Sequence, residues 1–179
     1  MKFNFCEDCN KKCCLEAAPR ISKAERDEIV RIAGRDLFSN VSGFFVPKTR
    51  DGFCAYFEKG RCSIHDHKPA ECSFYPIYVM VDHDDMVFLT LDTYCPNIEK
   101  IPPETLAKYV FIAAEWMNKV DFVMFRGIKG RKDIPLEDFL KRKGKEYTEN
   151  FTKELEKLTG GSGEWSERNR IRLHGTIMP

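Results

Sequence analysis

The stretch Cys54–Pro76 constrains the fold of this chain more than any other. Its residues 54–72 hold three cysteines, and the whole stretch adds four aromatic residues, two histidines and two prolines. A core strand does not need three thiols, and a solvated loop does not need four aromatic rings. A folded shell around a group that binds sulfur explains both features. We therefore interpret this stretch as the centre of a metal-binding system.

The compartment of the protein decides how its eight cysteines are interpreted. No apolar signal segment precedes the first cysteine, and no apolar run approaches the roughly 20 residues of a membrane helix. We therefore expect a cytoplasmic protein, where thiols stay reduced and a cysteine cluster favours metal over disulfides. Four disulfides are the alternative, because some hyperthermophiles keep disulfides inside the cell. The formal net charge of +1 gives no pull toward nucleic acid or membrane.

Local signals in the first half predict both helix and strand. Ser22-Lys-Ala-Glu25 is a capping box, and Gly34 suits a C-terminal cap, so we expect a helix over about residues 23–33. The other elements predicted here are strands at 44–46 and 53–57 joined by polar residues 49–52, a short helix from Pro69 to about Cys72, and a hairpin of residues 77–81 and 86–91.

The second half is predicted to be mainly helical. Apolar residues from Leu106 to Met124 recur at spacings of three and four, which predicts one helical face over residues 103–124 packed on the sheet. Residues 135–158 form a second, more charged helical region, interrupted near Gly144.

The predicted fold is α+β, a single domain in which a small antiparallel sheet carries the metal shell. Metal-bound loops and covering C-terminal helices complete it. We expect residues 1–159 to form the cysteine-cluster metal-binding domain. Residues 160–179 are expected to be a flexible linker followed by a basic tail, because they open on Gly-Gly-Ser-Gly.

All eight cysteines are candidate metal ligands, because thiolate binds zinc and is the usual ligand of iron–sulfur clusters. They are Cys6, Cys9, Cys13, Cys14, Cys54, Cys62, Cys72 and Cys95. Eight thiols divide into two sets of four, although one site with bystander thiols is also open. Adjacent residues in an extended segment point to opposite faces. On that basis we expect Cys13 and Cys14 to serve two neighbouring centres.

Two smaller signals bear on the chemistry of the site. Cys95-Pro96 is similar to ferredoxin-type motifs, in which a proline follows a cluster ligand, and this favours iron–sulfur. His65 and His67 lie beside Cys62 as metal ligands or proton carriers, with a hydrogen-bonded polar turn as the alternative. The sequence identifies no catalytic residue and no organic cofactor site.

The run Cys62-x-Ile-x3-Lys-Pro-x2-Cys72-x2-Tyr-Pro76 resembles the central signature of the YkgJ-type cysteine-cluster family, also known as the CxxCxxCC zinc- or iron-chelating domain. The opening cysteines and Cys54 match the same pattern, over about residues 6–97. Three signature positions differ, with His65 for tyrosine and Lys68 and Ser73 for arginine. The opening cluster also has one extra residue between its second cysteine and the Cys13–Cys14 pair. The cysteines themselves are intact.

The resemblance implies a small zinc- or iron-binding protein, or an iron–sulfur oxidoreductase. A related cysteine domain occurs in the longer flagellin lysine N-methylases, so methyl transfer is implied by analogy only. We expect an iron–sulfur cluster and favour the [4Fe–4S] type. We also expect a redox or protein partner of unknown identity and no association with a membrane. The alternative is a zinc-stabilised module without catalysis that binds protein or nucleic acid. That alternative rests on the basic segment from Arg126 to Lys145.

Overall fold

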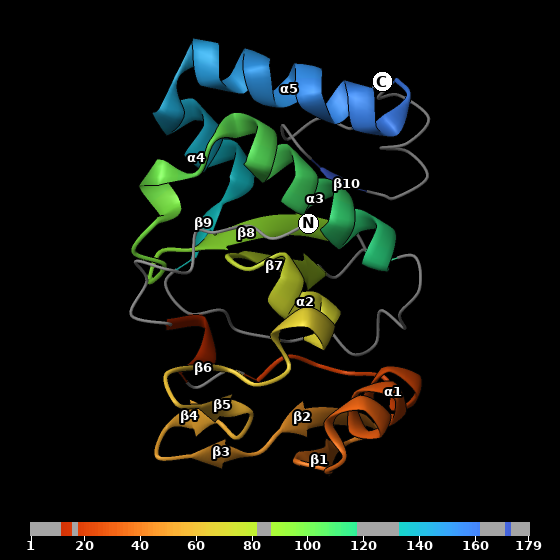
Figure 1. Ribbon diagram of the computed structural model, residues 1–179. Helices are drawn as coiled ribbons and strands as arrows, with labels where there is room; N and C mark the ends of the chain where they lie inside the picture. The colour runs from red at the N-terminus through yellow and green to blue at the C-terminus, as the bar shows by residue number, and fades with distance from the viewer. Residues whose placement is uncertain (1–11, 16–17, 82–86, 118–132, 162–170, 173–179) are drawn as a thin grey trace. The chain divides into compact units, whose positions relative to one another are not determined.

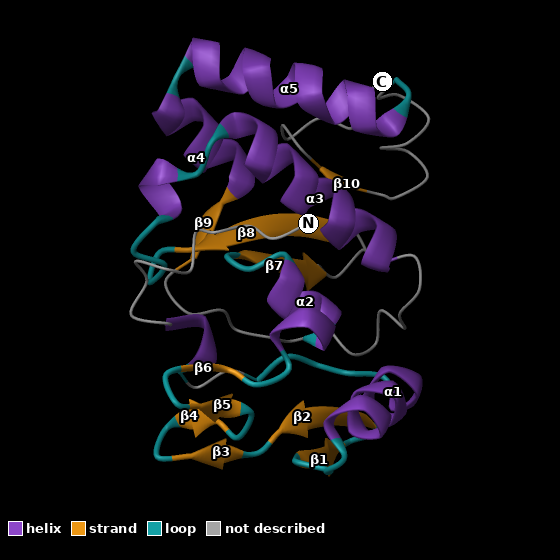
Figure 2. Cartoon of the chain, in the orientation of Figure 1, coloured by secondary structure: helices purple, strands orange, loops and turns teal. Residues whose placement is uncertain are grey.

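We analysed a computed structural model of the chain, which describes residues 12–15, 18–81, 87–117, 133–161 and 171–172. The chain divides into two compact units, residues 1–73 and residues 74–179, and each is described here by itself. Helices and short antiparallel ladders occur in both (Figure 2), which confirms the α+β class.

The described part of unit 1 contains one longer helix, two short 3-10 turns, a four-residue helix and three hairpins (Figure 1). Its elements are η2 (Lys12–Cys14), α1 (Lys23–Ala33), β1 (Phe38–Val41), β2 (Phe44–Pro47), β3 (Thr49–Arg50), β4 (Phe53–Cys54), β5 (Phe57–Glu58), β6 (Arg61–Cys62), η3 (His65–His67) and α2 (Ala70–Ser73).

Helix α1 begins and ends where its caps predict. The Ser22 side chain accepts a hydrogen bond from the Glu25 backbone N–H at 3.2 Å. At the other end Gly34 adopts φ 68°, a left-handed conformation in which its N–H reaches the Val30 carbonyl. The predicted helix over 23–33 is therefore confirmed, and Ile29 is its fully buried residue.

The hairpins of unit 1 are tighter than the sequence suggested. Strand β2 pairs with the preceding β1, while β3 pairs with β4 and β5 with β6. The turns Asp51-Gly52 and Lys59-Gly60 have positive φ at both residues. Such two-residue turns match the twist of the strands that they join. Residues 44–46 are thus in a strand as predicted, whereas the predicted strand at 53–57 is divided between β4 and β5.

A small core holds unit 1 together. Ile21, Ile29, Phe38, Tyr56 and Ile64 are buried against one another. Two cysteines, Cys54 and Cys62, are partly buried against this cluster. The Tyr56 hydroxyl is satisfied by donating to the Arg35 carbonyl at 3.1 Å. The apolar core therefore lies directly beneath two of the candidate ligands.

Unit 2 contains a sheet and a helical layer. Its elements are β7 (Ile77–Val81), β8 (Val87–Asp92), η4 (Ile98–Lys100), α3 (Pro103–Met117), β9 (Asp133–Pro135), α4 (Leu136–Lys143), α5 (Lys145–Thr159) and β10 (Ile171–Arg172). Strands β7 and β8 form the predicted antiparallel hairpin. Along the other edge of β8, β9 pairs antiparallel with its end and β10 pairs parallel with its start.

The helices of unit 2 follow their apolar patterns. Helix α3 packs against β7, and α5 packs on α3 and α4 (Figure 1). The predicted face from Leu106 to Met117 is buried, and residues 118–124 of that prediction lie outside the described residues. The predicted interruption at Gly144, with φ 89°, separates α4 from α5.

The sheet and the cysteine hairpins lie in different units. The sheet covered by α3 belongs to unit 2, whereas the hairpins with Cys54 and Cys62 belong to unit 1. Within residues 160–179, Ile171–Arg172 form a paired strand, while the boundary at 159 stays a prediction.

Among the helices that the structure describes, none is long and apolar enough to cross a membrane.

Candidate metal centre

Cys54 and Cys62 are placed by two successive hairpins. Cys54 ends β4 opposite Thr49, and Cys62 ends β6 opposite Phe57. Between them the Ser63 N–H and hydroxyl both donate to the Tyr56 carbonyl, at 2.8 and 2.9 Å. Tyr56 itself is fully buried. The backbone that carries Cys54 and Cys62 is therefore held in place at this residue.

The N-terminal cysteine segment reaches this hairpin through one antiparallel bridge. Leu15 pairs with Phe53, which brings the preceding Cys14 to the level of Cys54. No periodicity in the sequence predicts a bridge between positions so far apart. Among the described residues, this bridge connects the segment of Cys13 and Cys14 to the hairpin of Cys54.

Cys13 and Cys14 lie on the same side of their segment. Residues 12–14 form a 3-10 turn rather than an extended strand, and the two sulfur atoms are 3.9 Å apart. The expected alternation of faces is therefore wrong here, because it requires extended backbone. Sulfur atoms 2.3 Å from a tetrahedral metal ion lie about 3.8 Å from each other. The two thiols are thus close enough to serve one centre, although a [4Fe–4S] cubane, with one thiolate per iron, would hold them farther apart than a single zinc ion does.

Cys72 lies on α2, a single helical turn. Hydrogen bonds that involve two carboxylates of unit 1 hold this turn in place. The Ala70 N–H donates to Glu25 Oε1 at 2.7 Å, and the Arg20 N–H donates to Glu71 Oε2 at 2.7 Å. Burial raises the pKa of Glu71 to about 7, against the opposing effect of Arg20. Burial is also the main reason that the Cys72 pKa is raised.

The five described thiols of unit 1 influence one another electrostatically. The pKa of Cys54 and that of Cys62 are raised, first by burial and then by neighbouring thiolate charge. The pKa of Cys72 is raised further by the charges of Cys54, Cys13 and Cys62. Like charges shift a pKa mainly over short range in a partly buried site, so these thiols lie in one part of unit 1. We call Cys13, Cys14, Cys54, Cys62 and Cys72 the thiol cluster.

Within the thiol cluster, Cys13 is the thiol most readily ionised. Its pKa is lowered to about 7, first because Cys14 donates a hydrogen bond to its sulfur, and then because the Lys68 ammonium is nearby. The same hydrogen bond, burial and thiolate charge raise the pKa of Cys14. This is the behaviour of two sulfurs that share one proton, and a bound cation would replace that proton.

The donor set fits a thiophilic metal, although the described residues do not form a finished coordination shell. No three metal-binding side chains within the described ranges converge closely enough to hold an ion by themselves. Such sites usually close only when the metal binds, and Cys6 and Cys9 lie outside the described residues. The six described cysteines, the thiol cluster and Cys95, are not joined in disulfides with one another.

Comparison with known families identifies the cysteine pattern. A family model named CxxCxxCC and described as "Putative zinc- or iron-chelating domain" matches residues 5–96. This chain belongs to the CxxCxxCC family. The suspected resemblance is thereby confirmed, and metal binding through its cysteines follows as the family's property. No curated protein and no solved structure matches the chain, so the likeness to flagellin lysine N-methylases stays a prediction.

The last cysteine of the CxxCxxCC pattern lies in unit 2. Cys95 is buried in the turn after β8, where its N–H donates to the Asp92 carbonyl at 3.1 Å. The Asp92 side chain accepts from the Tyr75 hydroxyl at 2.9 Å and from the Tyr94 N–H at 2.8 Å. This buried carboxylate therefore fixes the turn that presents Cys95, whose role as a ligand stays a prediction.

The histidines of the CxxCxxCC signature are exposed. His65 and His67 both lie on η3. Neither belongs to a group of three possible metal ligands among the described residues. Their role as ligands stays a prediction, and their setting is that of a polar turn. His83 and His174 lie outside the described residues.

Sequence reasoning missed three polar residues that shape this region. Glu25 was assigned only to the capping box, yet it also binds the backbone of α2. Glu71 and Asp92 carried no motif at all. A carboxylate next to a cysteine or at a strand end is a faint signal, and only the tertiary contacts give it meaning.

Proposed function

We propose that this CxxCxxCC protein binds an iron–sulfur cluster of the [4Fe–4S] type and serves as a redox protein. The observation that carries the proposal is the thiol cluster. Five described thiols from separate segments gather within one unit, enough for the four thiolates of a cubane. A structural zinc also takes four thiolates, so the choice of iron–sulfur rests on Cys95-Pro96, where a proline follows a cysteine as in ferredoxin-type motifs.

The surroundings of the thiol cluster also suit iron–sulfur. Phe53 and Phe57, which flank Cys54, stack with ring centroids 4.8 Å apart, and Tyr56 between them is buried. Apolar rings beside the sulfurs limit solvent access, which governs the reduction potential of a cluster. A bound cluster would supply one-electron transfer, and we propose that its four thiolate ligands come from the eight cysteines of the sequence.

The experiment is anaerobic purification followed by metal and sulfide analysis. We expect iron and acid-labile sulfide in equal amounts, a broad visible absorption, and a reducible cluster by electron paramagnetic resonance. Cys72→Ser should diminish all three signals. Stoichiometric zinc in a colourless protein without labile sulfide would reject the iron–sulfur proposal and favour the zinc module.

The zinc alternative included nucleic-acid binding by the basic segment, and the described part of that segment speaks against it. Lys141 pairs with Asp138 at 3.3 Å and Lys145 with Glu149 at 3.7 Å. Arg142 and Lys143 both pair with Glu99. Acidic partners cancel the positive field that a phosphate backbone would meet.

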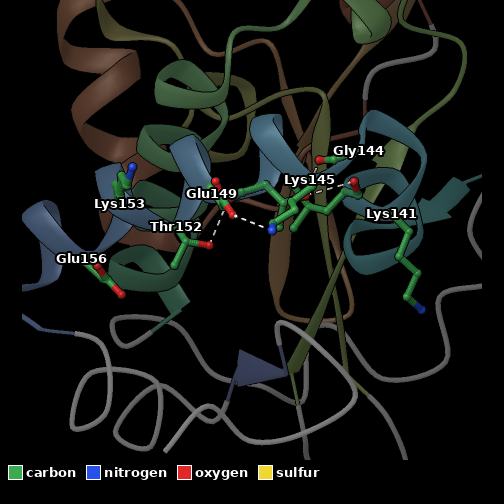
Figure 3. A pocket seen from close by; sticks show the side chains of 9 residues that line it. Lys141, Gly144, Lys145, Glu149, Thr152, Lys153 and Glu156 are labelled. Carbon is green, nitrogen blue, oxygen red and sulfur yellow. Dashed lines mark hydrogen bonds and ion pairs between the residues drawn. The ribbon is translucent and has the colours of Figure 1, made fainter.

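The surface beside this segment has the same mixed character. A groove of about 440 Å³ runs between α4 and α5, and Lys145, Glu149, Lys153 and Glu156 line it in succession (Figure 3). Its threonine hydroxyls donate to helix carbonyls, as Thr152 does to Thr148 at 2.9 Å. Such a surface is typical of a solvated helix pair. The partner that we propose is therefore a redox protein rather than nucleic acid.

A further inference from the structure

The four-residue helix α2 cannot set the direction of Cys72 by itself. Its support includes the Cys72 N–H on the Pro69 carbonyl at 2.9 Å and the Ser73 hydroxyl on the same carbonyl at 3.3 Å. A single helical turn fixes several backbone dihedrals for very few hydrogen bonds, so it is unstable when isolated. The orientation of the Cys72 thiol must therefore depend on contacts outside α2.

Glu25 supplies the first of these contacts. Its carboxylate accepts the Ala70 N–H, the first N–H of α2, at 2.7 Å, while its own N–H donates to the Ser22 hydroxyl that caps α1. One residue therefore takes part in the N-terminal hydrogen bonds of two helices. Helix α1 packs on the core of unit 1 through Ile29. The bond between Glu25 and Ala70 therefore holds α2 in a fixed position relative to that core.

Glu71 supplies the second contact from the opposite direction. Its Oε2 accepts the Arg20 N–H at 2.7 Å, and the Arg20 guanidinium stabilises its negative charge. The next residue along the chain, Ile21, is fully buried and is bridged to Phe45 by two backbone hydrogen bonds of 2.9 Å. Arg20 is thus a fixed point, and Glu71 ties α2 to it.

We propose that Glu25 and Glu71 are positioning residues that aim the Cys72 thiol at the rest of the thiol cluster. Together they fasten α2 to residues 20–25 at both of its first two positions. Neither carboxylate touches the metal in this proposal, and both act through backbone N–H groups. The inference rests on the proposed function, in that Cys72 must be a ligand.

Cobalt(II) titration of the metal-free full chain tests this, because the thiolate-to-cobalt charge-transfer band grows with the number of bound thiolates. Outer residues that orient ligands typically change metal affinity about 10- to 100-fold. We expect Glu25→Ala and Glu71→Ala each to weaken cobalt binding by about that factor and to diminish the band as Cys72→Ser does. Adding Cys72→Ser to either variant should cause little further loss.

Conservative variants separate positioning from charge. Glu25→Gln and Glu71→Gln keep an oxygen that accepts the same N–H, so both should retain the wild-type spectrum. The matched control is Glu28→Ala, which removes an exposed carboxylate of α1 whose partner is Arg31 at 2.6 Å. It should leave the spectrum unchanged. Equal losses in the Gln and Ala variants would overturn the positioning role.

Thiol alkylation with mass spectrometry gives a readout that does not need metal. In metal-free Glu25→Ala or Glu71→Ala, Cys72 should react faster with iodoacetamide while Cys95, in unit 2, keeps its rate. A uniform rise over all cysteines would mean general unfolding and would overturn the inference. If Cys72→Ser alone leaves the cobalt spectrum intact, the ligand assignment fails. If only the Ala variants leave it intact, the inference fails and the proposed function stands.

Discussion

Asp92 is a buried side chain of unit 2 whose carboxylate accepts several hydrogen bonds, and replacing it with alanine should strongly destabilise that unit. The residue is 1% exposed, and its carboxylate accepts hydrogen bonds from Tyr75, Tyr94 and, at 3.4 Å, Tyr78. Alanine leaves these donors without their acceptor. A buried donor without a partner costs about 1–3 kcal/mol.

The magnitude follows from the geometry. The two short bonds, at 2.9 and 2.8 Å, are each expected to contribute about 2 kcal/mol, and the longer Tyr78 bond adds little. We therefore expect Asp92→Ala to lower the free energy of unfolding by about 4 kcal/mol. Asn keeps one accepting oxygen but turns an N–H₂ toward the other donor, so Asp92→Asn should cost about half as much. Tyr75→Phe should cost about 1.5 kcal/mol.

Urea unfolding followed by circular dichroism, with metal held saturating, measures these differences. With a denaturant slope of about 1–3 kcal/mol/M, a loss of 4 kcal/mol moves the midpoint by more than 1 M. Glu156→Ala, on the exposed face of α5, is the control and should stay within about 0.5 kcal/mol of wild type. A loss below about 1 kcal/mol for Asp92→Ala would refute the reasoning, because it would mean that water or another group replaces the carboxylate.

Three further predictions concern the metal. Anaerobic chelation should lower the melting temperature, because the core cluster in the described part of unit 1 is small; an unchanged melting curve would contradict a structural metal. Truncation after Leu158 should leave metal stoichiometry unchanged, since it removes none of the eight cysteines, and lost metal would show that the tail contributes to the site. Cys13→Ser and Cys14→Ser should each reduce metal content, and the double variant should lose no more than the larger single loss; additive losses would instead support two centres.

The elements that the sequence predicted well are those with a local cause. Helix α1 has its capping box and its glycine, and α4 and α5 are separated by a glycine in a conformation that helices do not adopt. The hairpin β7–β8 has a mainly apolar run on each side of the polar residues His83-Asp-Asp85. In each case the information lies within a few residues, where propensity and capping decide the structure.

The candidate site was predictable in its residue types and not in its assembly. The cysteines and their family pattern are visible in the sequence, yet the bridge from Leu15 to Phe53 that gathers them is not. The supporting role of Glu71 is equally invisible, because Arg20 lies 51 positions away. Contacts between distant segments depend on how the core packs, and no periodic signal specifies them.

The Cys13–Cys14 pair shows what such contacts change in the chemistry. Read as extended backbone, two adjacent cysteines imply two metal centres, one on each face. In a 3-10 turn the same residues place their sulfurs 3.9 Å apart, close to the edge of one tetrahedral thiolate site. Two thiolates at that distance repel each other, so without metal they share a proton, as the opposite pKa shifts of the pair indicate. A cation that binds both sulfurs removes this repulsion, and the turn therefore favours one shared centre over two separate ones.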